Sequence, residues 1–223
     1  MPTWSGPLLV MVWLLLLAQA ALALRRRWPE QREWSRKLGH IGTGAVLPLA
    51  WACGIERGIA LPAAALVTVA ALLNHRLQLL PAIEDVGRPS YGTVAYGGAI
   101  TVLLFLYWPA SPQVATAAVL VMALGDGLAG LIGARVASPR WQVWGQTKSL
   151  IGTLTMALVS LGVLILMVPI SVALGLPAPP LAMLPLLALV AAALEQMALL
   201  GLDNLTVPLG VALLWQWAAG IVG

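Results

Sequence analysis

The feature that most constrains this chain is its succession of long apolar segments, separated by short breaks that contain glycine, proline or charged residues. The chain is 61% hydrophobic and only 9% charged, whereas soluble domains carry about 25% charged residues. Segments of about 20 apolar residues are long enough to cross a bilayer. The predicted spans are residues 7–24, 38–53, 58–73, 91–108, 113–133, 150–168, 181–200 and 205–222. The sequence therefore predicts an all-α, polytopic membrane helical bundle with about eight transmembrane helices.

We expect one membrane domain over residues 1–223, with a first span (1–24), a basic segment (25–37) and a helical core (38–223). Three arginines follow the first span, at residues 25–27, whereas a signal peptide carries its positive charge before the apolar run. A retained first span is the preferred interpretation. Cleavage after the small residues of 18–23 is the weaker alternative. Cys53 is the single cysteine, so it has no partner in the chain for a disulfide or a cysteine metal site.

Charge placement predicts the orientation. Six of the twelve basic residues lie in 25–37, and with both termini outside, eleven of the twelve fall on one face, with Arg57 opposite. The positive-inside rule makes that face cytoplasmic. Seven of the eight acids also fall there, Glu56 being the exception, which the rule does not explain. We expect an active site at this face. The basic segment also suits anionic lipid headgroups or a nucleotide. Because it is one short loop, it does not indicate nucleic-acid binding.

Asp126 stands in an otherwise uncharged apolar run, where a carboxylate costs roughly 2.5–3.5 kcal/mol on insertion scales. Such a residue is predicted to be functional, with a partner, a proton or a metal. On a helix it shares a face with Gly130 and Gly133, which leaves bare backbone beside it. Gly125, Ala129 and Gly133 recur every four residues, a pattern that lets membrane helices pack closely.

A basic segment with Arg135 and Arg140 follows, and then Lys148 and Ser149, with Gly152 three residues later. We expect Lys148 to face the same side of the membrane as Asp126 and to bind phosphate. The stretch is similar to the end of a P-loop, but the preceding glycine spacing and a βαβ unit are missing, so a P-loop is rejected.

Arg36, Lys37 and His40 open the second predicted span. Arg36 and His40 share a helix face, and both can donate hydrogen bonds to a phosphate. The alternative for Lys37 is an ordinary anchor at the inner end of a span.

Arg88, Ser90, Gly92 and Thr93 surround the start of the fourth predicted span. Pro89 ends any preceding helix and Ser90 is expected to cap the next one. These residues form either an anion site at a helix N-terminus or a plain loop and cap.

Glu195 is a second acid within an apolar segment, and Asp203 and Asn204 precede the last one. Asp203 or Asn204 can cap that helix. Together with Asp126, the acids are sufficient for Mg²⁺, which binds one or two carboxylates and completes its shell with water and phosphate oxygens.

The motifs described above, taken in their order along the chain, resemble those of the phytol, farnesol and dolichol kinases. These are membrane kinases of isoprenoid alcohols that are distantly related to phosphatidate cytidylyltransferases. The segment Gln142-Val143-Trp144-Gly145 and the compact length are most similar to bacterial phytol-kinase-type members. The matching motifs are Arg36-Lys37-x-x-His40, Gly87-Arg88-x-Ser90-x-Gly92-Thr93, Gly125-Asp126-x-x-Ala129-x-x-x-Gly133, Lys148-Ser149-x-x-Gly152 and Gly201-x-Asp203-Asn204.

The resemblance implies transfer of a phosphoryl group from a nucleoside triphosphate, typically CTP, to an isoprenoid alcohol, with Mg²⁺ as cofactor. It implies catalytic roles for Asp126, Lys148 and Glu195, and metal binding by Asp126 and Asp203. The resemblance leaves open whether Asp126 or Glu195 is the base that takes the proton of the alcohol. The residues implied in nucleotide or phosphate binding are Arg36, Lys37, His40, Arg88, Ser90, Gly92, Thr93, Gly125, Gly133, Ser149, Gly152 and Asn204.

Two other functions remain open at this point. One is cytidylyl transfer to a phosphorylated lipid, which would use the same nucleotide and metal but release pyrophosphate. The other is a small transporter in which Asp126 and Glu195 relay protons, although no internal repeat is visible. The sequence is compatible with CTP, ATP or UTP as donor, with phytol, geranylgeraniol or farnesol as acceptor, and with any oligomeric state.

Overall fold

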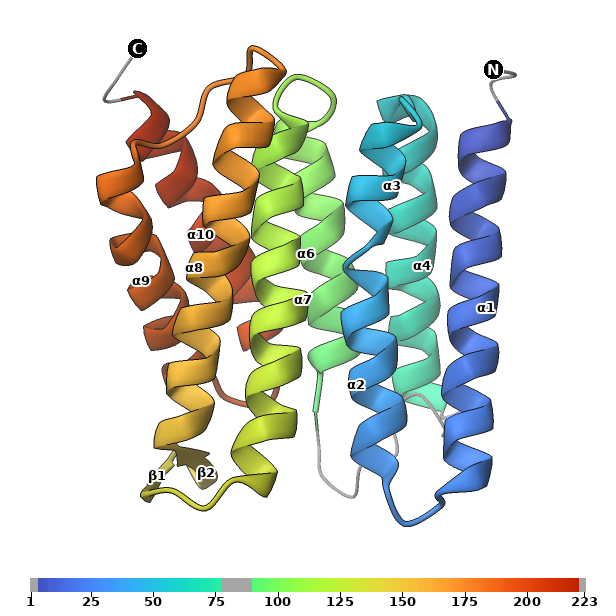
Figure 1. Cartoon of the computed structure of the whole chain (residues 1–223). Coiled ribbons are helices and arrows are strands. Elements are labelled where there is room, and N and C mark those ends of the chain that lie inside the picture. The colour runs from blue at the N-terminus through green and yellow to red at the C-terminus, as the bar shows by residue number, and fades with distance from the viewer. Residues whose placement is uncertain (1–3, 78–89, 221–223) are drawn as a thin grey trace.

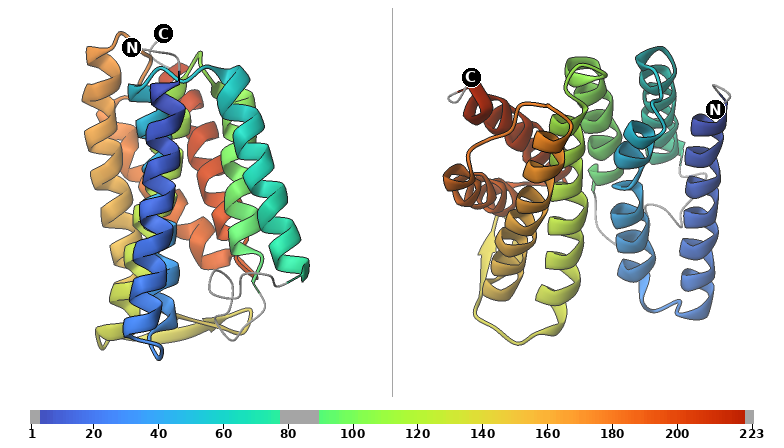
Figure 2. Two further views of the ribbon diagram at one scale, coloured as in Figure 1. Left: turned by 90° about the vertical axis from the view of Figure 1, so that its right-hand side faces the viewer. Right: turned by 45° about the horizontal axis from the view of Figure 1, so that its top comes forward.

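The computed structural model describes residues 4–77 and 90–220, which form a bundle of helices that run roughly side by side (Figure 1). Arg88 lies outside the described residues, so its prediction is neither confirmed nor contradicted. The described chain begins and ends at one end of the bundle, and a short hairpin lies at the other end (Figure 2, left). The helices are α1 (Ser5–Arg27), α2 (Arg32–Thr43), α3 (Val46–Ala52), α4 (Arg57–Leu77), α6 (Gly92–Tyr107), α7 (Pro112–Arg135), α8 (Leu150–Ala173), the 3₁₀ turn η1 (Leu181–Met183), α9 (Leu184–Met197) and α10 (Asp203–Gly220).

The prediction of an all-α membrane bundle is confirmed. Four helices of the described part are long and apolar enough to cross a membrane, namely α1, α4, α7 and α8. Each predicted span contains a helix, and the shorter apolar helices are Gly92–Tyr107 and Leu181–Met197. The chain thus alternates between the two ends of the bundle, as the sequence predicted.

The second predicted span is wrong in detail because the structure divides it into two helices. α2 begins at Arg32, inside the segment expected to be a basic loop, and α3 starts only after a turn at Gly44 and Ala45. A Cβ at Gly44 would collide with the Cβ of Ala123 on α7. The glycine therefore lets the break in the helix sit directly against α7, which is the usual use of glycine at a helix interruption.

A β-hairpin replaces the loop that was expected after α7. Strands β1 (Arg140–Val143) and β2 (Gln146–Ser149) are antiparallel, and Trp141 is opposite Lys148. The two-residue loop has positive φ at both Trp144 (51°) and Gly145 (76°). These angles belong to the type I′ turn, whose twist matches that of the paired strands.

α7 is the central helix, because it packs against α2, α6, α8 and α10. Its small residues let neighbours approach: a Cβ at Gly125 would lie 2.6 Å from Met156 Sδ, and one at Gly133 would lie 3.1 Å from Gly152 Cα. The packing prediction for this glycine spacing is confirmed. α1 is peripheral and exposes apolar side chains, and its Trp13 indole donates a 2.9 Å hydrogen bond to the Gly42 carbonyl on α2.

Candidate functional site

A cavity of about 910 Å³ is lined by residues of the hairpin and of the helix ends beside it. Its walls come from α2, the C-terminal part of α7, the hairpin, the start of α8, the end of α9 and the start of α10. Charged side chains of both signs line it, so segments far apart in the sequence contribute to one polar site. These residues are Glu33, Arg36, Lys37, Asp126, Arg135, Arg140, Lys148, Glu195 and Asp203.

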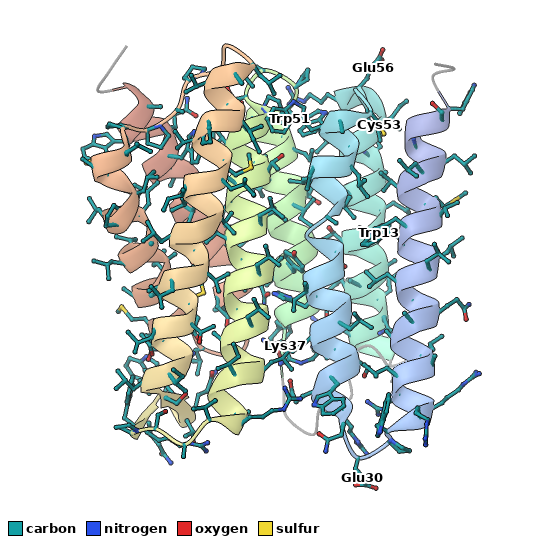
Figure 3. The ribbon with its side chains drawn as sticks, in the orientation of Figure 1. Trp13, Glu30, Lys37, Trp51, Cys53 and Glu56 are labelled. Atoms are coloured by element: carbon teal, nitrogen blue, oxygen red, sulfur yellow. The ribbon has the colours of Figure 1, made fainter. Side chains whose placement is uncertain are left out.

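Lys37 and Asp126 form a buried ion pair between α2 and α7. Lys37 Nζ lies 2.7 Å from Asp126 Oδ2 and donates a second hydrogen bond, of 3.0 Å, to the Asp126 carbonyl. Gly130, one turn further along α7, makes room for the lysine, because a Cβ there would lie 2.7 Å from Lys37 Cε. Figure 3 labels Lys37 where α2 faces α7. The pair gives the Asp126 carboxylate a partner within the apolar bundle.

His40 contacts the same carboxylate as Lys37 does. Its Nε2 lies 3.3 Å from Asp126 Oδ2 and 3.4 Å from the Met122 carbonyl, and its ring stacks against Tyr96 with centroids 4.6 Å apart. His40 is not among the residues that line the cavity. The structure therefore places it where it can orient Asp126 rather than at the surface that would face a phosphate.

Lys148 and Glu195 form a second pair, which joins the hairpin to α9. Lys148 Nζ lies 2.5 Å from Glu195 Oε1 and 2.8 Å from the Glu195 carbonyl. The other carboxylate oxygen accepts a 2.8 Å hydrogen bond from Gln196 Nε2, which also contacts the Thr153 hydroxyl at 2.8 Å. Each lysine thus binds both the carboxylate and the carbonyl of its acid, and both oxygens of Glu195 are engaged.

Asp203 brings a third carboxylate to these two pairs. One ligand oxygen each from Asp126, Glu195 and Asp203 lie within 4.8 Å of one another. Asp203 Oδ1 accepts hydrogen bonds from the Asn204 backbone amide (3.0 Å) and side-chain amide (3.2 Å), which fix it at the start of α10. This donor set fits a divalent cation such as Mg²⁺, which prefers carboxylate oxygens and keeps part of its shell for other ligands.

The two non-glycine residues with positive φ in the described part of the chain both line this cavity. They are Trp144 (φ 51°) in the hairpin and Leu200 (φ 55°) before α10, and each precedes a glycine with positive φ. Such backbone conformations cost about 1–3 kcal/mol each and concentrate at functional sites. After Leu200, Gly201 permits close packing, because a Cβ there would lie 2.7 Å from the Gly92 nitrogen.

The motif around Ser90 contributes less to the cavity than expected. Ser90 lines the cavity, but α6 begins at Gly92. The N-cap position is therefore occupied by Tyr91 and not, as had been expected, by Ser90. Ser90 Oγ instead accepts a 3.2 Å hydrogen bond from the Gly92 amide. Gly92 is buried against Gly201, and Thr93 is exposed outside the cavity lining.

The residues of the Lys-Ser-x-x-Gly motif have different roles. Lys148 reaches Glu195, whereas Ser149 is the N-cap of α8 and accepts a 3.2 Å hydrogen bond from the Gly152 amide. Ser149 Oγ also donates to the Gly133 carbonyl at 3.4 Å, so Gly133 and Gly152 lie at the cavity wall where α7 meets α8. Gly125 packs against α8 and is not part of the cavity lining.

Three participants were missed from the sequence. Gln196 and Thr153 position Glu195, and the hairpin carries Trp144 to the cavity. A hairpin signal was present, because residues 140–149 place a Trp-Gly pair between two short runs that contain Trp, Val and Thr. Gln196, an amide next to Glu195 in an apolar helix, was a weaker signal of a polar site.

Comparison with known proteins supports the resemblance seen in the motifs. The chain is 39% identical over 219 residues to the protein named phytol kinase from Synechocystis sp. (strain ATCC 27184 / PCC 6803 / Kazusa), covering 98% of this chain and 93% of that protein. The chain belongs to the phytol kinase family. The matched region is nearly the whole chain, so it includes both the helical bundle and the residues that line the cavity. No protein-family model matches the chain, and no solved structure matches it.

The Lys148–Glu195 pair generates a stability prediction. Lys148→Met leaves the Glu195 carboxylate buried without its cation, which typically costs about 3–5 kcal/mol of unfolding free energy. The loss in the Lys148→Met/Glu195→Gln double variant should be smaller than the sum of the single losses, because both charges are then absent. Equilibrium unfolding in mixed detergent micelles measures these values.

Arg36→Met is the matched control, because Arg36 pairs at 2.8 Å with Glu33 on the same helix and Glu33 is 48% exposed. An exposed pair of this kind is worth less than about 1 kcal/mol. Equal destabilisation by Lys148→Met and Arg36→Met would contradict the assigned importance of the buried pair.

Proposed function

We propose that this protein is a membrane kinase that transfers the γ-phosphate of a nucleoside triphosphate, CTP, to the hydroxyl of an isoprenoid alcohol such as phytol. The observation that carries the proposal is the meeting of three carboxylates and two lysines in one cavity, at Asp126, Glu195, Asp203, Lys37 and Lys148. Phosphoryl transfer depends mainly on positioning and on stabilising charge, which this set of groups can supply. The name of the 39% identical relative supports the same class of reaction.

In this proposal Asp126 and Asp203 hold the metal. Each engages one carboxylate oxygen in its contacts with Lys37, His40 or Asn204, whereas both oxygens of Glu195 are bound by Lys148 and Gln196. Asp126 and Asp203 thus have the greater remaining capacity for a ligand. When bound, Mg²⁺ would neutralise charge on the phosphate oxygens.

The two lysines bind phosphate in this account. An ammonium group has three N–H donors, and Lys37 and Lys148 each use two of them on a carboxylate and a carbonyl. The remaining donor of each is available to a phosphate oxygen. Arg36, Arg135 and Arg140 also line the cavity and would add positive charge along a triphosphate. Arg88, outside the described residues, keeps its predicted role as a further cation.

The proton of the alcohol must leave as its oxygen forms the bond to the γ-phosphorus and the bond to the β–γ bridging oxygen breaks. Asp126 and Glu195 are the candidate bases. Hydrogen bonds from Lys148 and Gln196 position Glu195, and contacts with Lys37 and His40 position Asp126. Both carboxylates are therefore held in place beside the expected position of the γ-phosphate.

The cavity end of the bundle is proposed to face the cytoplasm, with both termini outside. Nucleotides then reach the cavity from water, and the alcohol arrives from the surrounding lipid with its hydroxyl at the interface. The basic residues at this end, including Arg25–Arg27 at the end of α1, follow the positive-inside pattern.

The transfer reaction tests the proposed function. Purified protein in lipid nanodiscs receives Mg²⁺, a mixture of phytol, geranylgeraniol and farnesol, and CTP labelled separately on the γ-phosphate and on the cytosine. We expect γ-label alone in the lipid fraction, with at least a hundredfold loss in Asp126→Asn, because the charge that orders the site is removed.

Glu56→Gln is the control, because Glu56 lies at the opposite end of the bundle (Figure 3). Its activity should equal that of the wild type. Cytosine label in the lipid after addition of phosphatidate would instead indicate a cytidylyltransferase. Absence of transfer from CTP, ATP and UTP would contradict the kinase and favour a transporter.

The orientation has its own test, because Cys53 is exposed at the end that holds the chain termini (Figure 3). A membrane-impermeant maleimide added to intact cells should label Cys53. It should not label Gln142→Cys, at the exposed hairpin, in a Cys53→Ala background. The reverse pattern of labelling would contradict the proposed cytoplasmic cavity.

A further inference from the structure

We infer that Trp144, at the tip of the hairpin, is the platform on which the base of the nucleotide stacks. The inference rests on the proposed function, since it assumes that the cavity takes a nucleoside triphosphate. It assigns a base-binding position to a residue that plays no part in the ion pairs or in the carboxylate cluster.

The backbone at Trp144 is the first observation. Its φ of 51° lies in the left-handed region, which costs a side-chain-bearing residue roughly 1–2 kcal/mol. Type I′ loops normally place Asn or Asp before the glycine, because these residues tolerate the conformation. A tryptophan therefore occupies the least suitable position of the hairpin, and the turn itself gives no reason for it.

The position of the ring is the second observation. Trp144 is 69% exposed and yet lines the charged cavity, so its ring is available at the rim to a ligand. It stands three residues along the hairpin from the paired residues Trp141 and Lys148, a separation of about 10 Å at the usual rise of a strand. A ribose and a triphosphate chain can bridge such a distance. With the phosphates at Lys148, the base would then lie at Trp144.

Trp141 offers a comparison within the same hairpin. It is 38% exposed on β1, but it is not among the residues that line the cavity. An exposed tryptophan of that kind suits the membrane interface, where aromatic rings are common. Trp144 differs because it shares its cavity with four acids and several cations, which is a polar setting for a nucleotide and a poor one for lipid tails.

Amide side chains in the same cavity can complement the platform. Gln31 and Gln146 both line it, and an amide offers a donor and an acceptor to the edge of a base. Stacking itself is tolerant of base identity, because every base has a π face. Trp144 is thus expected to set affinity for nucleotides as a class, whereas groups such as these amides would set the choice among bases.

Equilibrium binding to the full-length protein in nanodiscs, with Mg²⁺ present, tests the inference. The probes are CTP, ATP and inorganic tripolyphosphate, which has the phosphates but no base. Trp144→Asn removes the ring and inserts the residue that the turn prefers, so the hairpin is retained. We expect about tenfold weaker binding of CTP and ATP and unchanged binding of tripolyphosphate, since one stacked base contributes about that much affinity.

Two further variants complete the design. Trp144→Phe keeps an aromatic face and should lose less nucleotide affinity than Trp144→Asn, whereas Trp141→Val should bind all three probes like the wild type. Unchanged CTP binding in Trp144→Asn, or equal losses for CTP and tripolyphosphate, would overturn this inference alone. Wild-type protein that binds tripolyphosphate but neither nucleotide would overturn the proposed function as well.

Discussion

The structure depends on the burial of two lysine–carboxylate pairs at one end of an apolar bundle. Lys37 with Asp126 joins α2 to α7, and Lys148 with Glu195 joins the hairpin to α9. Removing two charges from water costs several kcal/mol per ion, so such pairs persist only with close geometry and further hydrogen bonds. Both lysines meet this condition in the same way, by binding the backbone carbonyl of the partner acid as well. The glycine at 130, beside Lys37, provides the space that this geometry requires.

In the proposed reaction, the pairs would keep the site in a fixed arrangement before a substrate arrives. Lysine ammonium groups held in fixed positions can stabilise developing charge without reorganising, which is the main electrostatic contribution to many enzymatic rates. His40 and Gln196 hold the two paired acids, and Asn204 holds Asp203. The three carboxylates thus approach within 4.8 Å although they belong to three different helices. The strained turns at Trp144 and Leu200 lie at the same cavity, where strain can serve ligand binding.

The sequence predicted the features that depend on local composition and periodicity. Apolar segment lengths indicated the membrane bundle, and the isolated Asp126 indicated the part of α7 that lines the cavity. It did not predict which residues pair, because Lys37 and Asp126 are 89 positions apart and Lys148 and Glu195 are 47 apart. Those contacts follow from tertiary packing, which spacing does not encode. The same limit applies to His40, expected at a phosphate but placed behind Asp126, and to the break at Gly44, which depends on contact with Ala123.

The central claim is that the carboxylate cluster binds the metal used in phosphoryl transfer, and a change of metal preference at Asp203 tests it most directly. In a Cys53→Ser background, Asp203→Cys replaces a hard oxygen ligand by a thiolate, which favours soft metals. The account predicts that kinase activity of this variant is lost with Mg²⁺ and partly restored by Cd²⁺, whereas Asp203→Ala is restored by neither. Wild-type activity of Asp203→Cys with Mg²⁺ would contradict the claim.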